Sequence, residues 1–338
     1  MQITVSDPAA AQASGALGRV ALRCGIAICA VLALLSNQAH GQARPIEVCM
    51  PGNGGGSLDI LTRQVMLRLS QVNGGRPAIV LNIPGASGTI AIDRCIRQPA
   101  TGDFYLMGYT SNILAAQHLY PKLAYDPYKD LRPVTLLGSI PYFILVPANS
   151  KFTTLQSLLA YIKANPGKVN FGSGGIGAGG HLGGEMLSLA AGSKMVHIPF
   201  AGASAAGIAL LGGHVDLVVE GVSGTIAHVK GGKMRALAVT AGDRVAVAPD
   251  VPTVTELGYP QLQLSTWIGV FMRADTPDAI VARASGELNK ALDMPAVRQG
   301  FAELGARVEG GSPQSFSEFV ASQRMTYDVL MQQIENSR

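Results

Sequence analysis

The sequence contains few charged side chains, and they are not gathered into clusters of one sign. Only 14% of its 338 residues are charged, and the formal net charge is +4. Proteins that bind nucleic acids usually concentrate lysine and arginine among aromatic residues, and no segment of this sequence does so. A nucleic-acid partner is therefore not expected. Because 48% of the residues are hydrophobic, the chain can bury a substantial core, which argues against intrinsic disorder.

Long hydrophobic runs are also missing. The apolar run at residues 25–35 is about half the ~20 residues that a transmembrane helix needs. Two arginines precede it and small residues follow it, which is typical of a secretory signal peptide. We therefore expect residues 1–43 to be a signal peptide, cleaved after Gly41 or Ala43, with an N-terminal anchor helix as the alternative. The mature chain is then expected to be a soluble periplasmic protein.

Cysteine is scarce, and the cysteines show no metal-site spacing. Cys24 and Cys29 lie in the predicted signal peptide, which leaves Cys49 and Cys95. An oxidising compartment allows such a pair to form a disulfide, while two buried free thiols are equally compatible with the sequence. We expect the two residues to lie close enough to bridge, because they belong to neighbouring predicted elements.

Glycine, by contrast, is abundant, with 41 residues, and it gathers between predicted strands and helices. The alternation of strand, glycine-rich loop and helix predicts an α/β fold with mostly parallel sheets. Ser57 and Thr154 are expected to be helix N-caps. The predicted strands are 46–50, 78–83, 104–110, 168–171, 195–199, 215–220, 235–240 and 264–272. The main predicted helices begin at 57, 89, 154, 181, 203 and 223, and three more cover 277–292, 295–304 and 313–336.

Four glycine-rich loops lie at the expected carboxyl ends of strands, where α/β proteins bind their ligands. These loops are residues 51–56, 84–88, 172–180 and 201–204. Each one precedes a predicted helix, and a helix N-terminus carries a partial positive charge that suits an anion. One such loop could simply form a tight turn, but four together favour an anion-binding cleft.

Two nucleotide-binding motifs are partly matched by these loops. A P-loop requires a lysine before the first helical serine, and Gly56 stands there instead. Residues 172–177 match the dinucleotide fingerprint GxGxxG, but the acidic residue expected about 20 positions later is missing. An NAD-linked oxidoreductase using Gly172–Gly177 is therefore kept only as an alternative, and no cofactor is predicted.

Signals for catalysis and for metal binding are weak. The sequence has no GxSxG nucleophile motif, and Ser173 lacks a base in its own segment, so it is interpreted as a hydrogen-bond donor. His214, Asp216 and Glu220 share one predicted strand, but a solvated histidine and a locally paired aspartate explain them better than a metal site. We therefore predict a binding protein with no catalytic residues and no metal.

A series of short motifs, found in order along the chain, resembles the Bug-type substrate-binding proteins of tripartite tricarboxylate transporters. The resemblance runs from about residue 44 to the C-terminus. The motifs are GGGSLD at 54–59, PGASG at 84–88, YDPYKDL at 125–131, PVTLL at 133–137, NPGK at 165–168, HLGGE at 181–185, HIPF at 197–200, LGGHVD at 211–216, GKMRALAVT at 232–240 and DVPT at 250–253.

This resemblance implies a two-lobed clamp of the type II periplasmic-binding-protein kind, with two crossing strands near 140–148 and 262–272. The expected limits are 44–146 for the first part of lobe one, 147–263 for lobe two, and 264–338 for the return strand and C-terminal helices of lobe one. A monomer would bind a small carboxylate and present it to a two-component integral membrane transporter. A ligand-sensing module for a membrane kinase would share the same fold.

The resemblance also implies which residues face the ligand. Apolar or small residues replace polar family residues at Ile83, Ile176, Ala178 and Gly180, and Glu220 precedes a glycine where the family usually has an Asp-Asn pair. We therefore expect a ligand with one main carboxylate and an apolar or aromatic body. The implied ligand-binding residues are Gly54, Gly55, Gly56, Ser57, Gly85, Ala86, Gly88, Thr110, Ser111, Ser173, Gly175, Ile176, Gly177, Ala178, Gly202, Ala203, Ser204 and Glu220.

Overall fold

The computed structural model describes residues 44–338 except 53, 121 and 338. The predicted signal peptide, its cleavage site and the first two cysteines lie outside the described residues. The chain from Pro45 onward forms one compact unit. In the described part, no helix combines the length and the apolar character needed to cross a membrane.

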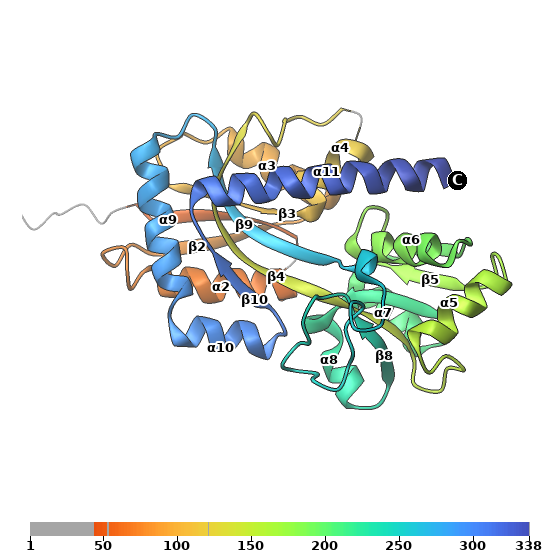
Figure 1. Ribbon diagram of the computed structural model, residues 1–338. Coiled ribbons are helices and arrows are strands. Elements are labelled where there is room, and N and C mark those ends of the chain that lie inside the picture. The colour runs from red at the N-terminus through yellow and green to blue at the C-terminus, as the bar shows by residue number, and fades with distance from the viewer. Residues whose placement is uncertain (1–43, 53, 121, 338) are drawn as a thin grey trace, which may run out of the picture. The chain divides into compact units, whose positions relative to one another are not determined.

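The first lobe is built on a mixed sheet (Figure 1). Strand β1 (Ile46–Pro51) lies between β2 (Ala78–Ile83) and β3 (Phe104–Tyr109), and these three run parallel. Strand β9 (Ser265–Arg273) is antiparallel to β3, and β4 (Leu131–Pro147) is antiparallel to β9. A short strand, β10 (Arg307–Gly310), pairs with the outer side of β4.

The second lobe repeats the arrangement around the other half of β4. Strand β5 (Asn170–Ser173) is parallel to β6 (Val196–Pro199) and to β7 (Leu217–Gly221). Both β7 and β8 (Met234–Val239) are antiparallel to β4. Strand β4 therefore belongs to both lobes: its first residues pair with β9 and its last ones with β7 and β8.

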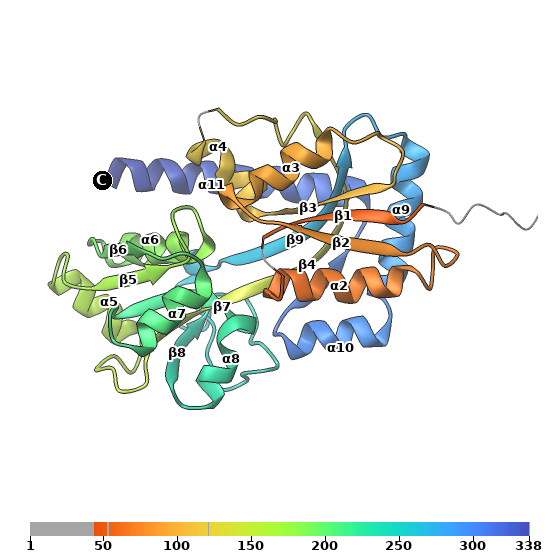
Figure 2. The same cartoon turned by 180° about the vertical axis from the view of Figure 1, so that it is seen from behind.

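Helices surround each lobe's sheet (Figures 1 and 2). Those of the first lobe are α2 (Ser57–Leu69), α3 (Thr89–Ile96), α4 (Ala116–Leu119), α9 (Asp278–Leu292), α10 (Pro295–Glu303) and α11 (Pro313–Ser337), with the 3-10 helix η1 (Ala86–Gly88) and the π-helix η2 (Ser111–Ala115). Those of the second lobe are α5 (Leu155–Ala164), α6 (Gly179–Ala191), α7 (Ala203–Leu211) and α8 (Val222–Lys230), with the turn η3 (Pro260–Leu262).

Apolar spacing explains how the helices attach. In α9, Val281, Ala284, Leu288 and Ala291 recur every three or four residues, so they form one face of the helix, and all four are buried. This face packs into a first-lobe core that also contains Val48 of β1. Fully burying a large aliphatic side chain contributes roughly 1.5–3 kcal/mol, so such faces fix the C-terminal helices on the first lobe.

A disulfide joins β1 to α3. Cys49 and Cys95 are both buried, their Cα atoms are 6.6 Å apart, and their sulfur atoms are bonded. The predicted proximity is confirmed, and the alternative of two free thiols is wrong for this structure. A cross-link over a sequence separation of 46 residues restricts the unfolded chain and stabilises the fold by about 4 kcal/mol on the chain-entropy model.

Several predicted element limits need correction. Ser57 is the first residue of α2 and not its N-cap, because Gly56 takes the extended N-cap conformation and no side chain caps the helix. Thr154, as predicted, caps α5, where it forms a capping box with Ser157. The first half of β4 and all of β10 were not predicted, because Pro133 interrupts the apolar pattern and β10 is only four residues long.

Candidate functional site

A cavity of about 660 Å³ lies where the two lobes face each other. Its floor is formed by Ile140 and Tyr142 of β4 and by Thr266 of β9, so the strands that cross between the lobes also form the base of the cavity. Apolar side chains form much of the wall. They include Met50, Leu58, Ile60, Ile208, Met234 and Leu304.

Four helices point their N-termini at this cavity. Helix α2 contributes its start from the first lobe, and α6, α7 and α8 contribute theirs from the second lobe. The first backbone N–H groups of a helix have no partner within the helix, and the helix dipole adds a partial positive charge there. The lining residues at these starts are Gly55, Gly56, Ser57, Ala178, Gly179, Gly180, Ala203, Ser204, Gly221 and Ser223.

Close backbone approach explains two of the glycines in the second-lobe loop. A Cβ atom on Gly174 would lie 2.8 Å from the backbone nitrogen of Ala203, and one on Gly180 would lie 2.5 Å from the carbonyl oxygen of Val219. Both distances are shorter than a real Cβ contact, so a side chain would push the loop away from α7 or β7. Glycine therefore lets the loop approach the start of α7 and lets the start of α6 approach β7.

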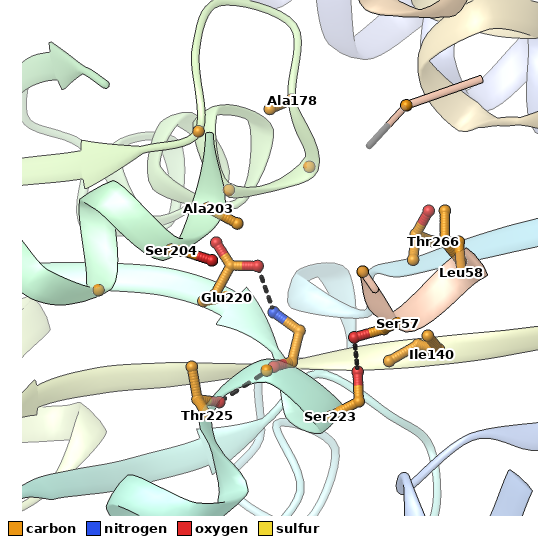
Figure 3. Close-up of a pocket in the computed structure, with 18 of the residues that line it drawn as sticks. Ser57, Leu58, Ile140, Ala178, Ala203, Ser204, Glu220, Ser223, Thr225 and Thr266 are labelled. Atoms are coloured by element: carbon orange, nitrogen blue, oxygen red, sulfur yellow. Dashed lines mark hydrogen bonds between the residues drawn. The ribbon is translucent and has the colours of Figure 1, made fainter. Parts of the chain in front are cut away.

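One hydrogen bond crosses the cavity between the lobes. The Ser223 hydroxyl at the start of α8 donates to the Ser57 hydroxyl at the start of α2, with 2.6 Å between the oxygens (Figure 3). Ser57 and Ser223 are far apart in sequence, and both line the cavity. The bond joins the two walls directly and favours the arrangement in which they are close.

Glu220, the second-to-last residue of β7, places its carboxyl group in the cavity (Figure 3). The backbone N–H of Gly221 donates to its Oε1 atom over 2.9 Å. No other hydrogen bond or ion pair reaches this carboxyl from the described residues. Burial raises the pKa of Glu220 to about 7, and the Gly221 hydrogen bond only partly opposes this increase.

Asp59, on the first-lobe wall, has the opposite environment. Its carboxylate accepts hydrogen bonds of 2.9 Å each from Arg63, Asn82 and the backbone N–H of Gly55. Burial alone would raise the pKa of Asp59, but these donors and the Arg63 charge outweigh it, so the pKa is lowered. The ionised carboxylate holds the loop before α2 in place.

This chain matches the family model described as the tripartite tricarboxylate transporter family receptor over residues 61–335. The chain belongs to that family. It is 34% identical to the protein BugT of Bordetella pertussis over 282 residues, which cover 83% of this chain and 86% of BugT.

Among solved structures, it resembles MatC from Rhodopseudomonas palustris with bound malate, with a TM-score of 0.75 and 29% identity, over 85% of this chain and 99% of MatC. It also resembles the periplasmic binding protein BugD, with a TM-score of 0.75 and 29% identity, over 86% of this chain and 98% of BugD. These proteins bind solutes and are not enzymes, so the family does not support the NAD-linked alternative.

Ser173 of this receptor lies outside the described lining of the cavity. Its hydroxyl has a neighbour that the sequence does not reveal. Its hydroxyl is 2.7 Å from Nε2 of His197, so a base lies beside Ser173 although none occurs in its own segment of the sequence. The base comes from the neighbouring strand β6, 24 residues later, which no local motif reveals. Ser173 is fully buried and also contacts the backbone of Gly175 over 3.1–3.2 Å, so its hydroxyl shapes the glycine-rich loop and is not accessible to a substrate.

A second histidine supports the same loop of the receptor. His181 stacks on His197 with 4.2 Å between ring centroids, and its Nδ1 atom accepts a hydrogen bond from the backbone N–H of Gly177 over 3.2 Å. Both rings lie beneath the loop and do not line the cavity. The loop that contributes to the cavity is therefore held from inside the second lobe.

The turn at the start of α3 is unusually strained. Four consecutive residues have positive φ: 120° at Gly85, 44° at Ala86, 54° at Ser87 and 93° at Gly88. The left-handed conformation costs a residue with a side chain roughly 1–2 kcal/mol, and such strain often accompanies ligand-binding loops. The turn follows β2 but lies outside the described cavity lining.

The structure brings together only some of the residues implied by the family resemblance. Thr110 lines a separate cavity of about 340 Å³ on the other face of β4, with Ser139 and Pro141. The implied residues that line the main cavity are Gly55, Gly56, Ser57, Ser111, Ala178, Ala203, Ser204 and Glu220. Those outside it are Gly54, Gly85, Ala86, Gly88, Thr110, Ser173, Gly175, Ile176, Gly177 and Gly202.

Sequence reasoning missed several residues of the receptor's cavity, notably Ile140, Tyr142, Ser223 and Thr266. Alternation along β4 could have identified the first two, because residues two apart on a strand share a face. Of the four positions where apolar or small residues replace polar family residues, Ala178 and Gly180 line the cavity. Ile83 is buried and Ile176 is exposed, and neither lines it.

Proposed function

We propose that this receptor captures a small carboxylate in the cavity between its lobes and presents it to a two-component integral membrane transporter. The convergence of four helix N-termini on one cavity carries the proposal. Neutral N–H donors at helix starts bind a carboxylate without a fixed counter-charge and without chemistry on the ligand. Bound malate in the structure of MatC agrees with this ligand class.

The cavity walls favour a ligand with an apolar body. Leu58, Ile140 and Ile208 come from three different elements and surround the space between the helix starts. Burying apolar ligand surface against them contributes roughly 25 cal/mol per Å². The receptor is therefore proposed to prefer carboxylates whose remaining atoms include an apolar segment.

Ligand binding is further proposed to close the two lobes. The helix starts belong to both lobes, so one ligand meets all of them only when the walls approach each other. A ligand that prefers the closed state shifts the population toward it by its differential affinity. We propose 44–146 and 264–338 as the first lobe and 147–263 as the second, with monomeric function in the periplasm after removal of residues 1–43.

Titration calorimetry against a panel of small carboxylates tests the binding function. At about 100 times the dissociation constant, a ligand adds roughly 2.7 kcal/mol of stability, which raises the melting temperature of a chain this size by several degrees. X-ray scattering should show a smaller radius of gyration with ligand, and the recovered ligand should be chemically unchanged. Turnover of the ligand, or no binding by any carboxylate, would contradict the proposal.

A further inference from the structure

Glu220 is an acidic group without a matching positive group in the cavity. The described residues that line the cavity include no lysine and no arginine. Asp59 already pairs with Arg63, which lies outside the lining. Glu220 receives only the N–H of its own neighbour, Gly221, and that bond engages Oε1. Its other oxygen, Oε2, is therefore available to a group of the ligand.

Groups on the surrounding elements leave the charge of Glu220 uncompensated. Burial, and after it the nearby Glu220 carboxylate, raise the pKa of the Tyr142 phenol on β4, so the phenol stays neutral. Asp59 of α2 is an anion that is already neutralised by Arg63. His228 of α8 supplies the one basic side chain among the described lining residues. None of these contacts Glu220 through a hydrogen bond or ion pair that the described residues show.

Closing the lobes around a ligand removes water from Glu220. An ionised carboxylate without a partner is costly to bury, so the closed complex requires either a proton on Glu220 or a positive group on the ligand. A second carboxylate on the ligand could lie beside Glu220 only if Glu220 carried a proton. An ammonium group would satisfy both oxygens of Glu220 through charge-assisted hydrogen bonds.

We propose that the ligand is zwitterionic, with its carboxylate at the helix N-termini, an apolar segment in the middle and a protonated amine paired with Glu220. This inference rests on the carboxylate-binding function proposed above and specifies its substrate class. Because burial raises the pKa of Glu220 to about 7, the acid is near its midpoint at neutral pH. A bound ammonium then shifts it to the ionised form, which couples recognition to proton release.

A matched ligand series tests the charge assignment. Hexanoate, 5-aminopentanoate and adipate share four methylenes and one carboxylate, and they end in a methyl, an ammonium and a second carboxylate. Equivalent triplets with two to six methylenes, and one with a benzene ring as spacer, allow for the unknown span. Calorimetry at pH 8 on the purified receptor should show the ammonium member binding about 10–100 times more tightly than its methyl analogue, as expected for a charge-assisted hydrogen bond.

Three variants test whether Glu220 causes the preference for the ammonium ligand. E220Q should lower the preference for ammonium over methyl to within about threefold. H228Q should still bind the ammonium ligand more tightly than its methyl analogue. This result would show that His228 is not the source of that preference. E318Q, which changes an acid on α11 outside the cavity, should behave as the wild type.

The pH dependence gives a readout that a purely structural role of Glu220 would not move. Affinity for the ammonium ligand should rise as the pH increases through about 7 and should be nearly flat in E220Q. If the dicarboxylate binds more tightly than the other two members of its triplet, and its affinity falls as the pH rises, the zwitterion proposal is wrong. Glu220 would then bind the ligand in its protonated form. Methyl and ammonium ligands of equal affinity would overturn the zwitterion proposal as well. If no carboxylate binds, whatever its terminal group, the result would instead contradict the proposed carboxylate-binding function itself.

Discussion

The two walls of the cavity each carry one acidic residue, and their environments are opposite. Asp59 on the first lobe has three hydrogen-bond donors and a lowered pKa. Glu220 on the second lobe has one donor and a raised pKa. The first acid is fully used in holding its own loop, while the second remains available. A side chain in the cavity lining is therefore not a ligand contact by its position alone. It can bind a ligand only if some of its hydrogen-bonding capacity is not used within the protein.

The two lobes are also stabilised by different kinds of interaction near the cavity. In the described residues, a disulfide ties β1 to α3 in the first lobe, close to the strained turn at 85–88. In the second-lobe loop, the backbone N–H groups of Gly175 and Gly177 donate hydrogen bonds to Ser173 Oγ and to His181 Nδ1. The first lobe is thus covalently braced near the cavity, and the second depends on packing and neutral polar contacts.

The disulfide gives the largest expected difference between the lobes. Replacing Cys49 and Cys95 by alanine together should lower the free energy of unfolding by about 4 kcal/mol, because the unfolded chain loses a cross-link. Urea unfolding of the variant and the oxidised wild type measures this. The reduced wild type is the control and should match the variant. Two alkylatable thiols in the denatured, unreduced wild type would show that the bond is absent.

Removing the first-lobe acid should also cost stability. Asp59→Ala leaves the Gly55 N–H, Asn82 and Arg63 without their shared acceptor. These donors are exposed or only partly buried, so each lost hydrogen bond contributes roughly 0.5–1.5 kcal/mol. We expect a loss of about 2 kcal/mol and weaker ligand binding, because the loop before α2 loosens. D93A, which breaks an exposed pair on α3, is the control and should change stability far less. Equal effects of the two variants would contradict the role of Asp59.

The two acids should impose opposite pH dependence on stability. The folded pKa of Glu220 is raised from 4.5 to about 7, so the folded state holds more protons in that window and stability falls as the pH rises through it. The full effect is on the order of 3 kcal/mol, and E220Q should abolish it. Asp59 has a lowered pKa, so its contribution is present above pH 3.8 and is lost as the pH falls below it. Melting temperatures from pH 3 to pH 8 for both variants test the two signs.

The hydrogen bond between the lobes should give the smallest effect. Ser223→Ala removes the donor to Ser57, and a neutral hydrogen bond contributes roughly 0.5–1.5 kcal/mol. If the bond favours the closed arrangement, ligand affinity should fall about 2–10-fold. A double-mutant cycle with Ser57→Ala isolates the pair, since the double variant should bind no more weakly than either single one. Additive losses would show that each serine acts through another contact.

Much of the fold was predictable because its signals are local. Strand β2 and helix α7 have the predicted limits, since an apolar run or a helical stretch ends at glycine or proline. The capping role of Thr154 depends only on a residue three positions later. Where the local signal was weak, as in the proline-containing first half of β4, the prediction failed because pairing with β9 decides the strand.

The sequence by itself determined the order of elements, the glycine-rich loops before helices and the family. Only the tertiary structure decided which of those loops reach the cavity, that Ser173 contacts His197, and that Ser57 meets Ser223. It also decided that Asp59 is paired and that Glu220 forms no ion pair with any described lining residue. The physical reason is that backbone propensity acts over a few residues, whereas burial and charge compensation depend on groups that folding brings together from distant parts of the chain.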